Sequence, residues 1–215
     1  MKFLDDVINS IIESLSEMFD STIEAQKNAI QSLVQEDNKK AMSVIDGDEA
    51  INRLEEQLNY DVMIAIAKYQ PVASDLRKLI AIIKVANDLE RIGDYAKTIS
   101  KTAILNCDKT FLNETFLKNS LKMSNIIIDL LEKAKNAFID GDVDGAYDII
   151  KNENQLQDLL KETISSNPFC LIEDENVESF MLLMGVIRTL ERSRGHLANI
   201  CEAIIFVGNG KFIEL

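Results

Sequence analysis

The chain contains the stretch Asp88-Leu89-Glu90-Arg91-Ile92-Gly93-Asp94, and an altered copy, Thr189-Leu190-Glu191-Arg192-Ser193-Arg194-Gly195, follows 101 residues later. Leu-Glu-Arg stays in register between the two, which indicates an internal repeat. In a helix, residues four apart lie one turn apart on the same face, so Glu90 would lie beside Asp94. The copy keeps the glutamate but has Gly195 in place of the aspartate. We therefore predict two similar halves, of which only the first keeps both carboxylates.

The repeat extends well beyond this stretch. At an offset of 105 residues, five upstream positions match: Ala29 with Ala134, Asp37 with Asp142, Ala41 with Ala146, Ile45 with Ile150 and Leu54 with Leu159. Downstream the offset is 101, and it matches Val85 with Val186, Leu89 with Leu190, Glu90 with Glu191, Arg91 with Arg192 and Ile99 with Ile200. A loop that differs by four residues between the halves explains the change of offset. The repeat predicts two domains, residues 1–108 and 109–215.

Apolar residues recur at spacings of three and four almost throughout, and no stretch alternates in the manner of a strand. This periodicity predicts an all-α fold of two tandem, pseudo-symmetric three-helix bundles built from six long helices. The expected helices cover residues 4–36, 38–69, 73–106, 112–140, 143–166 and 173–208. Asp37 and Asp142 are expected N-caps. Gln70-Pro71 and Asn167-Pro168 are expected to break the chain inside each half.

Composition limits the kinds of function that fit. The 215 residues are 47% hydrophobic, enough for a packed core, and carry a net charge of −13, which argues against nucleic acid as a partner. Cys107, Cys170 and Cys201 form no paired motif, so we expect free thiols rather than a zinc ribbon or a disulfide framework. The acidic N-terminus does not have the pattern of a signal peptide, and the apolar runs are too short to span a bilayer. These features predict a soluble, cytoplasmic protein.

A set of oxygen-bearing side chains borders the apolar faces of the second and third expected helices. One edge of the third helix begins apolar and ends with Glu90 and Asp94, and Asp48 and Asn52 border the apolar stripe of the second. The two pairs are equally distant from Pro71, so an antiparallel hairpin with its turn there would bring them to the same height. Asp48, Asn52, Glu90 and Asp94 are therefore predicted to bind one hard cation through oxygen ligands.

The second half contains a weaker version of this set. The equivalent positions hold Glu153, Gln157, Glu191 and Gly195. Only the carboxylates Glu153 and Glu191 remain, and Arg188 brings a positive charge into the same row. A metal ion is therefore expected to bind there weakly or not at all.

Three stretches of the first half carry a family resemblance: residues 70–77, Gln-Pro-Val-Ala-Ser-Asp-Leu-Arg; residues 89–94, Leu-Glu-Arg-Ile-Gly-Asp; and residues 44–55 of the second expected helix. The first two resemble two motifs of the PhoU family of phosphate-signalling proteins, and the third fits the second-helix pattern of that family. The second half matches through Leu190-Glu191-Arg192, His196, Asn199 and Ile200. It departs from the family pattern at Arg188, Ser193, Arg194 and Gly195, which puts a second metal site in doubt.

The resemblance implies two three-helix bundles with multinuclear metal clusters on Glu/Asp-x-x-x-Asp motifs. The metal would be divalent or ferric: Fe, Zn, Mn or Mg. It also implies a non-enzymatic negative regulator of phosphate uptake and phosphate-starvation genes. Such a protein couples the ATPase subunit of a phosphate ABC transporter to a sensor histidine kinase, and it reaches the membrane only through these partners. Whether it works as a homodimer stays open.

Two alternatives remain at this level. A carboxylate cluster with two metal ions can activate water, so a metal-dependent phosphohydrolase is one of them. Against it, the sequence shows no histidine cluster and no evident nucleophile with its base, and the lone His196 fits a capping or core-edge histidine. The other is a purely structural helical adaptor whose carboxylates pair with cations, for example Glu90 with Lys97.

Overall fold

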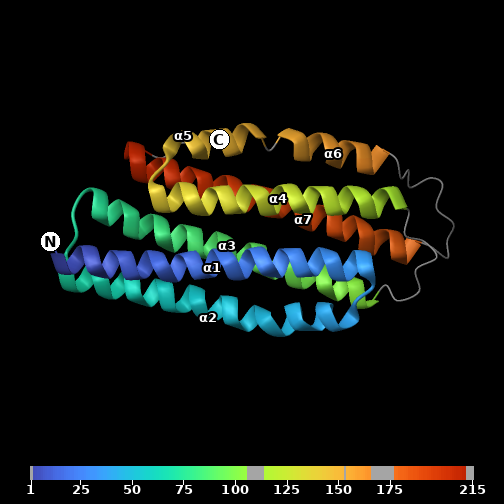
Figure 1. Ribbon diagram of the computed structural model, residues 1–215, viewed down its shortest axis with the longest axis horizontal. Helices are drawn as coiled ribbons and strands as arrows, with labels where there is room; N and C mark the ends of the chain where they lie inside the picture. Colours follow the sequence, from blue (N-terminus) through green and yellow to red (C-terminus); the bar gives the residue numbers. More distant parts are fainter. Residues whose placement is uncertain (1, 106–113, 153, 166–176, 212–215) are drawn as a thin grey trace.

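The computed structural model describes residues 2–105, 114–152, 154–165 and 177–211, and within these ranges the chain forms helices and short turns but no strand (Figure 1). The helices are α1 (Lys2–Gln35), α2 (Asn38–Tyr69), α3 (Ser74–Leu105), α4 (Glu114–Asp140), α5 (Val143–Asn152), α6 (Asn154–Ser165) and α7 (Val177–Asn209). The all-α class predicted from the apolar periodicity is confirmed.

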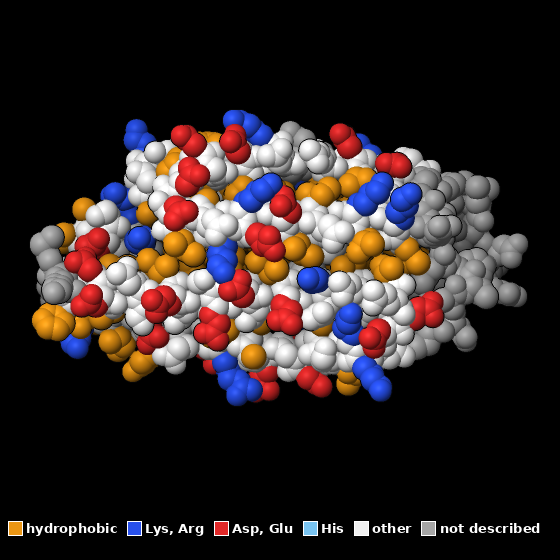
Figure 2. Space-filling model, in the orientation of Figure 1, with side chains coloured by type: hydrophobic (Ala, Val, Ile, Leu, Met, Phe, Trp, Pro, Cys, Tyr) orange, Lys and Arg blue, Asp and Glu red, His pale blue; other side chains and the backbone are white. Residues whose placement is uncertain are grey.

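The helices form two bundles that lie side by side. α1, α2 and α3 pack against one another, and α4 to α7 form the second group. α3 packs against α7, and α1 packs against α4. Figure 2 shows hydrophobic side chains along the line where α1 meets α4, and the buried hydrophobic core beneath contains residues of both halves. The tandem-bundle architecture is confirmed.

Two details of the predicted architecture need comment. The single helix expected over 143–166 appears as α5 and α6, on either side of residue 153, which lies outside the described residues. The expected boundary between residues 108 and 109 also lies outside them, so this boundary stays a prediction.

The predicted ends of the helices follow from local chemistry. The Lys40 amide donates a hydrogen bond to Asp37 Oδ1 at 3.0 Å, and the Gly145 amide donates to Asp142 Oδ1 at 2.9 Å. Both aspartates therefore cap helix N-termini, as expected. Gln70 ends α2 in the left-handed region, at φ 47°, where its amide donates to the Ile66 carbonyl. The Asn167-Pro168 turn lies outside the described residues.

The register of the α2–α3 hairpin is set by a close approach of the two helices. A Cβ atom added at Gly93 would lie 3.1 Å from Ile51 Cδ1, closer than most Cβ contacts, so Ile51 would have to shift by a few tenths of an ångström to make room for it. Ile51 and Gly93 lie almost equally far along the chain from Pro71. The expected register, which brings residues 48–52 level with residues 90–94, is confirmed.

Two further expectations can be compared with the structure. No helix among the described residues is long and apolar enough to cross a membrane. Cys201 is buried and is in no disulfide within the described residues, as expected, whereas Cys107 and Cys170 lie outside them.

Candidate metal centre

Asp48 is the most buried member of the predicted metal site. It lies on the inner face of α2, and its side chain is only 4% exposed. The Lys97 ammonium, one helix away on α3, lies 2.5 Å from Asp48 Oδ2. This ion pair raises the pKa of Lys97, chiefly through the hydrogen bond to the aspartate. A buried carboxylate needs such a partner, because burying a charge alone is costly.

Glu90 lies among several negative charges. Its side chain is 18% exposed, and Arg91 Nε lies 3.4 Å from Glu90 Oε2. Partial burial raises the pKa of the Glu90 carboxyl, and the negative charges of Asp94, Glu55 and Asp48 raise it further, while Arg91 lowers it. The carboxylates of α2 and α3 are therefore close enough to repel one another.

Three of the four predicted ligands carry a buried oxygen atom without a hydrogen-bond partner. These atoms are Asp48 Oδ1, Asn52 Oδ1 and Glu90 Oε2. The contact of Glu90 Oε2 with Arg91 is an ion pair at 3.4 Å rather than a well-formed hydrogen bond. Leaving buried acceptors unsatisfied costs free energy, so this is a place where a bound cation would stabilise the protein. The donor set consists of oxygens only and fits a hard cation.

The carboxylates of the predicted ligands do not converge on one point. Among the described residues, no three His, Cys, Asp or Glu side chains are arranged so that they could hold a metal ion. Lys97 lies on Asp48, and Arg91 bridges Glu90 to Asp94 Oδ2, the latter at 3.3 Å. A metal ion would have to displace these cations, so the ligand assignment stays a prediction. The pairing of carboxylates with cations, the structural alternative, is present here, although Lys97 pairs with Asp48 rather than with Glu90.

Sequence reasoning missed one participant in this cluster and gave another the wrong partner. Glu55, which was missed, contributes to the raised pKa of Glu90, and Lys97, which was expected beside Glu90, holds Asp48. A spacing signal existed for both, because Glu55 follows Asn52 and Lys97 follows Asp94 by three residues. Each therefore lies on the same helix face as a predicted ligand.

The second predicted set is only partly described. Glu153 lies outside the described residues, so its position cannot be compared with that of Asp48. Glu191 and Gln157 both line a cavity between α6 and α7. Binding of a metal by Glu153 and Glu191 stays a prediction.

His196 joins the two bundles rather than belonging to the acidic cluster. His196 Nδ1 on α7 lies 2.7 Å from Asp88 Oδ1 on α3, and the hydroxyl of Tyr95 lies 3.2 Å from Nε2. The Asn199 amide donates to the same Asp88 oxygen at 3.0 Å. The histidine is half-buried and has partners at both ring nitrogens, which matches the expected core-edge residue. Tyr95 and His196 are themselves 101 residues apart, at equivalent positions of the two repeats.

Comparison with solved structures finds the same fold. The crystal structure of the phosphate transport system regulatory protein PhoU from Streptococcus pneumoniae superposes with a TM-score of 0.90 over 99% of this chain and 100% of that chain, at 24% identity. PhoU from Pseudomonas aeruginosa superposes with a TM-score of 0.89 over 96% of this chain and 99% of that chain, at 25% identity.

Comparison of sequences identifies the family. The phosphate-specific transport system accessory protein PhoU homolog of Aquifex aeolicus is 30% identical, over 89% of this chain and 86% of that protein. PhoU homolog 1 of Thermotoga maritima is 29% identical, over 92% of this chain and 85% of that protein. The family model described as PhoU domain matches twice, at residues 15–103 and 121–204, in agreement with the internal repeat. The chain therefore belongs to the PhoU family.

Proposed function

We propose that this protein is a metal-binding, non-enzymatic regulator of phosphate uptake. Relatives that match over most of their length are phosphate-specific transport system accessory proteins by name, and these names support the transport role. In this proposal the protein acts in the cytoplasm and couples the ATPase subunit of a phosphate ABC transporter to a sensor histidine kinase. It restrains uptake and the phosphate-starvation response when phosphate is plentiful.

One observation carries the metal-binding part of the proposal. Asp48, Asn52 and Glu90 each hold a buried oxygen without a hydrogen-bond partner, and they lie on the facing sides of α2 and α3. A divalent or ferric ion would take these oxygens as ligands and so satisfy them. Asp94, which is more exposed, would complete the set from the solvent side.

Metal binding at this place would change the ion pairs of the cluster. In the structure, Lys97 neutralises Asp48 and Arg91 bridges Glu90 and Asp94. A metal ion would take over these carboxylates and release both cations toward the solvent. The surface of α3 would then carry two side chains in new positions, through which a partner protein could distinguish the metal-bound state.

The proposal is tested by co-purification. A tagged transporter ATPase subunit and a tagged kinase are each mixed with wild-type protein and with the double variant Glu90→Ala, Asp94→Ala, in metal-containing and in chelated buffer. We expect the wild type to co-purify with each tagged partner in metal-containing buffer. The double variant should not co-purify with either. Glu191→Ala, which removes the equivalent glutamate of the second bundle, is the matched control and should behave as wild type.

The outcomes separate a regulator from the alternatives. Absence of binding to both partners under all conditions would contradict the adaptor role. Turnover of a phosphate ester by the metal-loaded wild type, abolished by the same double variant, would instead favour a phosphohydrolase. Equal binding by the wild type and the double variant would show that the acidic cluster does not control docking.

A further inference from the structure

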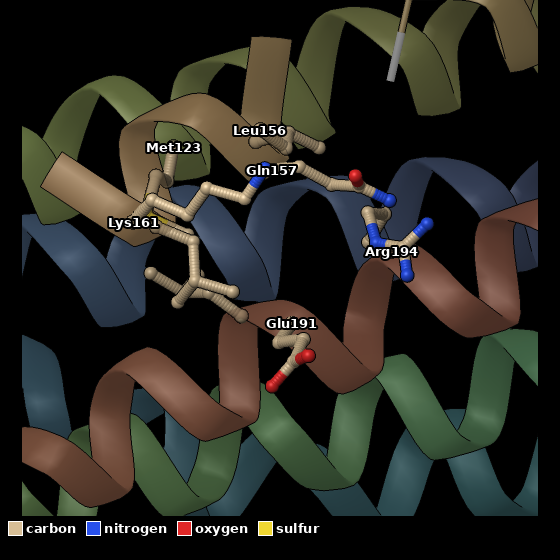
Figure 3. Close-up of a pocket in the computed structure, with 8 residues that line it drawn as sticks. Met123, Leu156, Gln157, Lys161, Glu191 and Arg194 are labelled. Atoms are coloured by element: carbon tan, nitrogen blue, oxygen red, sulfur yellow. The ribbon is translucent and has the colours of Figure 1, made fainter. Parts of the chain in front are cut away.

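A cavity of about 230 Å³ lies between α4, α6 and α7 in the second bundle (Figure 3). Gln157 and Lys161 line it from α6, and Glu191 and Arg194 line it from α7. Apolar side chains, including those of Met123 and Leu156, complete its walls. Pockets for drug-sized ligands typically have volumes of about 300–1,000 Å³, so this one suits a smaller molecule.

The internal repeat shows which residues differ between the two bundles at the level of this cavity. In the first bundle Gly93 lets Ile51 pack directly onto α3. The equivalent positions in the second bundle hold Arg194, at the offset of 101 residues, and Leu156, at the offset of 105. An arginine cannot allow the close approach that a glycine allows. At the level where α2 and α3 touch through Gly93 and Ile51, the second bundle has this cavity, and both Leu156 and Arg194 line it.

The charged residues at this place also differ between the two bundles. Lys161 stands at the position equivalent to Glu56, and Arg194 introduces a guanidinium where the first bundle has Gly93. The equivalent of Asp94 is Gly195, so one carboxylate is also lost. Among the described residues, two cations, Lys161 and Arg194, and one carboxylate, Glu191, line this cavity.

The polar groups are arranged unevenly around the cavity. In Figure 3 the Lys161 amine and the Arg194 guanidinium lie on the side of the Gln157 amide, whereas the Glu191 carboxylate is directed away from them. Lysine and arginine together offer several N–H donors, and the glutamine amide adds two more. A guanidinium can donate to an oxyanion while one of its other N–H groups keeps a protein partner.

We propose that this cavity binds a small oxyanion of the size and charge of phosphate. Donors on three side chains would surround the anion, and the apolar walls would limit its size. The net charge of −13 for the whole chain does not prevent this, because charges beyond about 8–10 Å are largely screened at physiological ionic strength. The inference goes beyond the regulatory function proposed above and does not depend on it.

The test uses inorganic phosphate as the probe, at constant ionic strength. Calorimetric titration of the wild type should show saturable binding. Lys161→Gln and Arg194→Gln should each weaken binding by about tenfold or more, because one charge-assisted contact is lost. Lys151→Gln, a change of an exposed lysine on α5, is the matched control and should leave the affinity unchanged.

A second measurement locates the anion and does not depend on the variants. In protein with labelled methionine methyl groups, the signal of Met123, which lines the cavity, should shift with added phosphate. The signal of Met18, buried in the first bundle, should not. Phenyl phosphate binding more weakly than phosphate would indicate a free anion, and tighter binding would indicate a phosphoryl group on a larger molecule.

Three results would overturn the inference. They are absence of saturable phosphate binding at millimolar concentrations, wild-type affinity in folded Lys161→Gln and Arg194→Gln proteins, and a phosphate-dependent shift at Met18 without one at Met123. The fold of each variant is checked by its helical circular dichroism and thermal transition.

Discussion

At the scale of single residues, Lys97 determines how the buried carboxylate of Asp48 is held. Its ammonium is the partner of Asp48, which is almost fully buried. The cluster has two ways to satisfy this carboxylate, an internal lysine or a metal ion. Lysine and metal exclude one another if both bind the same carboxylate oxygens of Asp48.

Replacing this lysine should therefore have two opposite effects. In chelated buffer, Lys97→Met should lower the free energy of unfolding by roughly 1–3 kcal/mol, between the values for an exposed and a buried ion pair. In metal-containing buffer the same variant should bind metal more tightly than wild type, since the competing cation is gone. Urea unfolding and metal titration check these results. Lys101→Met, an exposed lysine one turn further along α3, is the control.

An unchanged metal affinity in Lys97→Met, with the expected loss of stability, would contradict competition between the lysine and the metal. Asp48 would then stabilise the fold through its ion pair with Lys97 and would not bind metal.

The raised pKa of Glu90 predicts how stability depends on pH in the metal-free protein. Folding raises this pKa above its ordinary value of 4.5, so the native state binds more protons than the unfolded state just above that pH. The contribution of Glu90 to stability therefore falls as pH rises from 4.5 through the raised pKa. Glu90→Gln should remove this fall, so the variant gains stability relative to wild type across the window. Thermal unfolding in chelator at a series of pH values checks the prediction, and a constant difference between the two proteins would contradict it.

The sequence predicted which polar side chains come near one another but not their counter-ions. The proximity of Asp48, Asn52, Glu90 and Asp94 could be predicted because their distances from Pro71 are equal and the helices are regular, while their role as metal ligands stays a prediction. The partners Arg91 and Lys97 could not be assigned, because which carboxylate a long, flexible cation reaches depends on the side-chain packing of both helices. The hydrogen bonds of His196 also required the tertiary structure, because Asp88 lies 108 residues away.

At the scale of elements, the contact between α2 and α3 differs from its counterpart in the second bundle. Gly93 lies against Ile51, whereas its equivalent on α7 is Arg194. The next residue of α7, Gly195, stands where α3 has Asp94, and a Cβ added there would have nothing within 4 Å. The helices themselves and their ends were predictable from apolar spacing and from capping aspartates. The close approach of α2 to α3 was not predictable, because it depends on the single residue without a side chain that lies at their crossing.

This difference predicts opposite results for the same substitution. Gly195→Ala should raise the free energy of unfolding by about 0.5–1 kcal/mol, the usual helix preference of alanine over glycine. Gly93→Ala gains the same preference but crowds Ile51, and overpacking a core typically costs about 1–3 kcal/mol, so it should be neutral or destabilising. Urea unfolding of both variants checks the prediction. Equal stabilisation by the two substitutions would show that the α2–α3 approach is not tight.

At the scale of the whole molecule, the two bundles are joined through α3 and α7 by the hydrogen bonds of Asp88, His196 and Asn199. A double-mutant cycle with Asp88→Asn and His196→Gln should give a coupling energy of about 0.5–3 kcal/mol, the range for residues in one network. Urea unfolding of the four proteins measures it. Additive effects would mean that the Asp88–His196 contact contributes little to joining the bundles.

The central claim is that the two bundles have diverged, so that the oxygen cluster of α2 and α3 binds a metal and its counterpart does not. The most direct measurement is the metal content of purified protein after equilibration with Mn²⁺ and removal of free metal. We predict that wild type and Glu191→Ala retain the same amount of metal and that Glu90→Ala, Asp94→Ala retains none. We also predict that Arg188→Asn, Gly195→Asp retains more than wild type, because it restores ligand chemistry to the second bundle. Equal metal content in the wild type and in Glu90→Ala, Asp94→Ala would contradict the account.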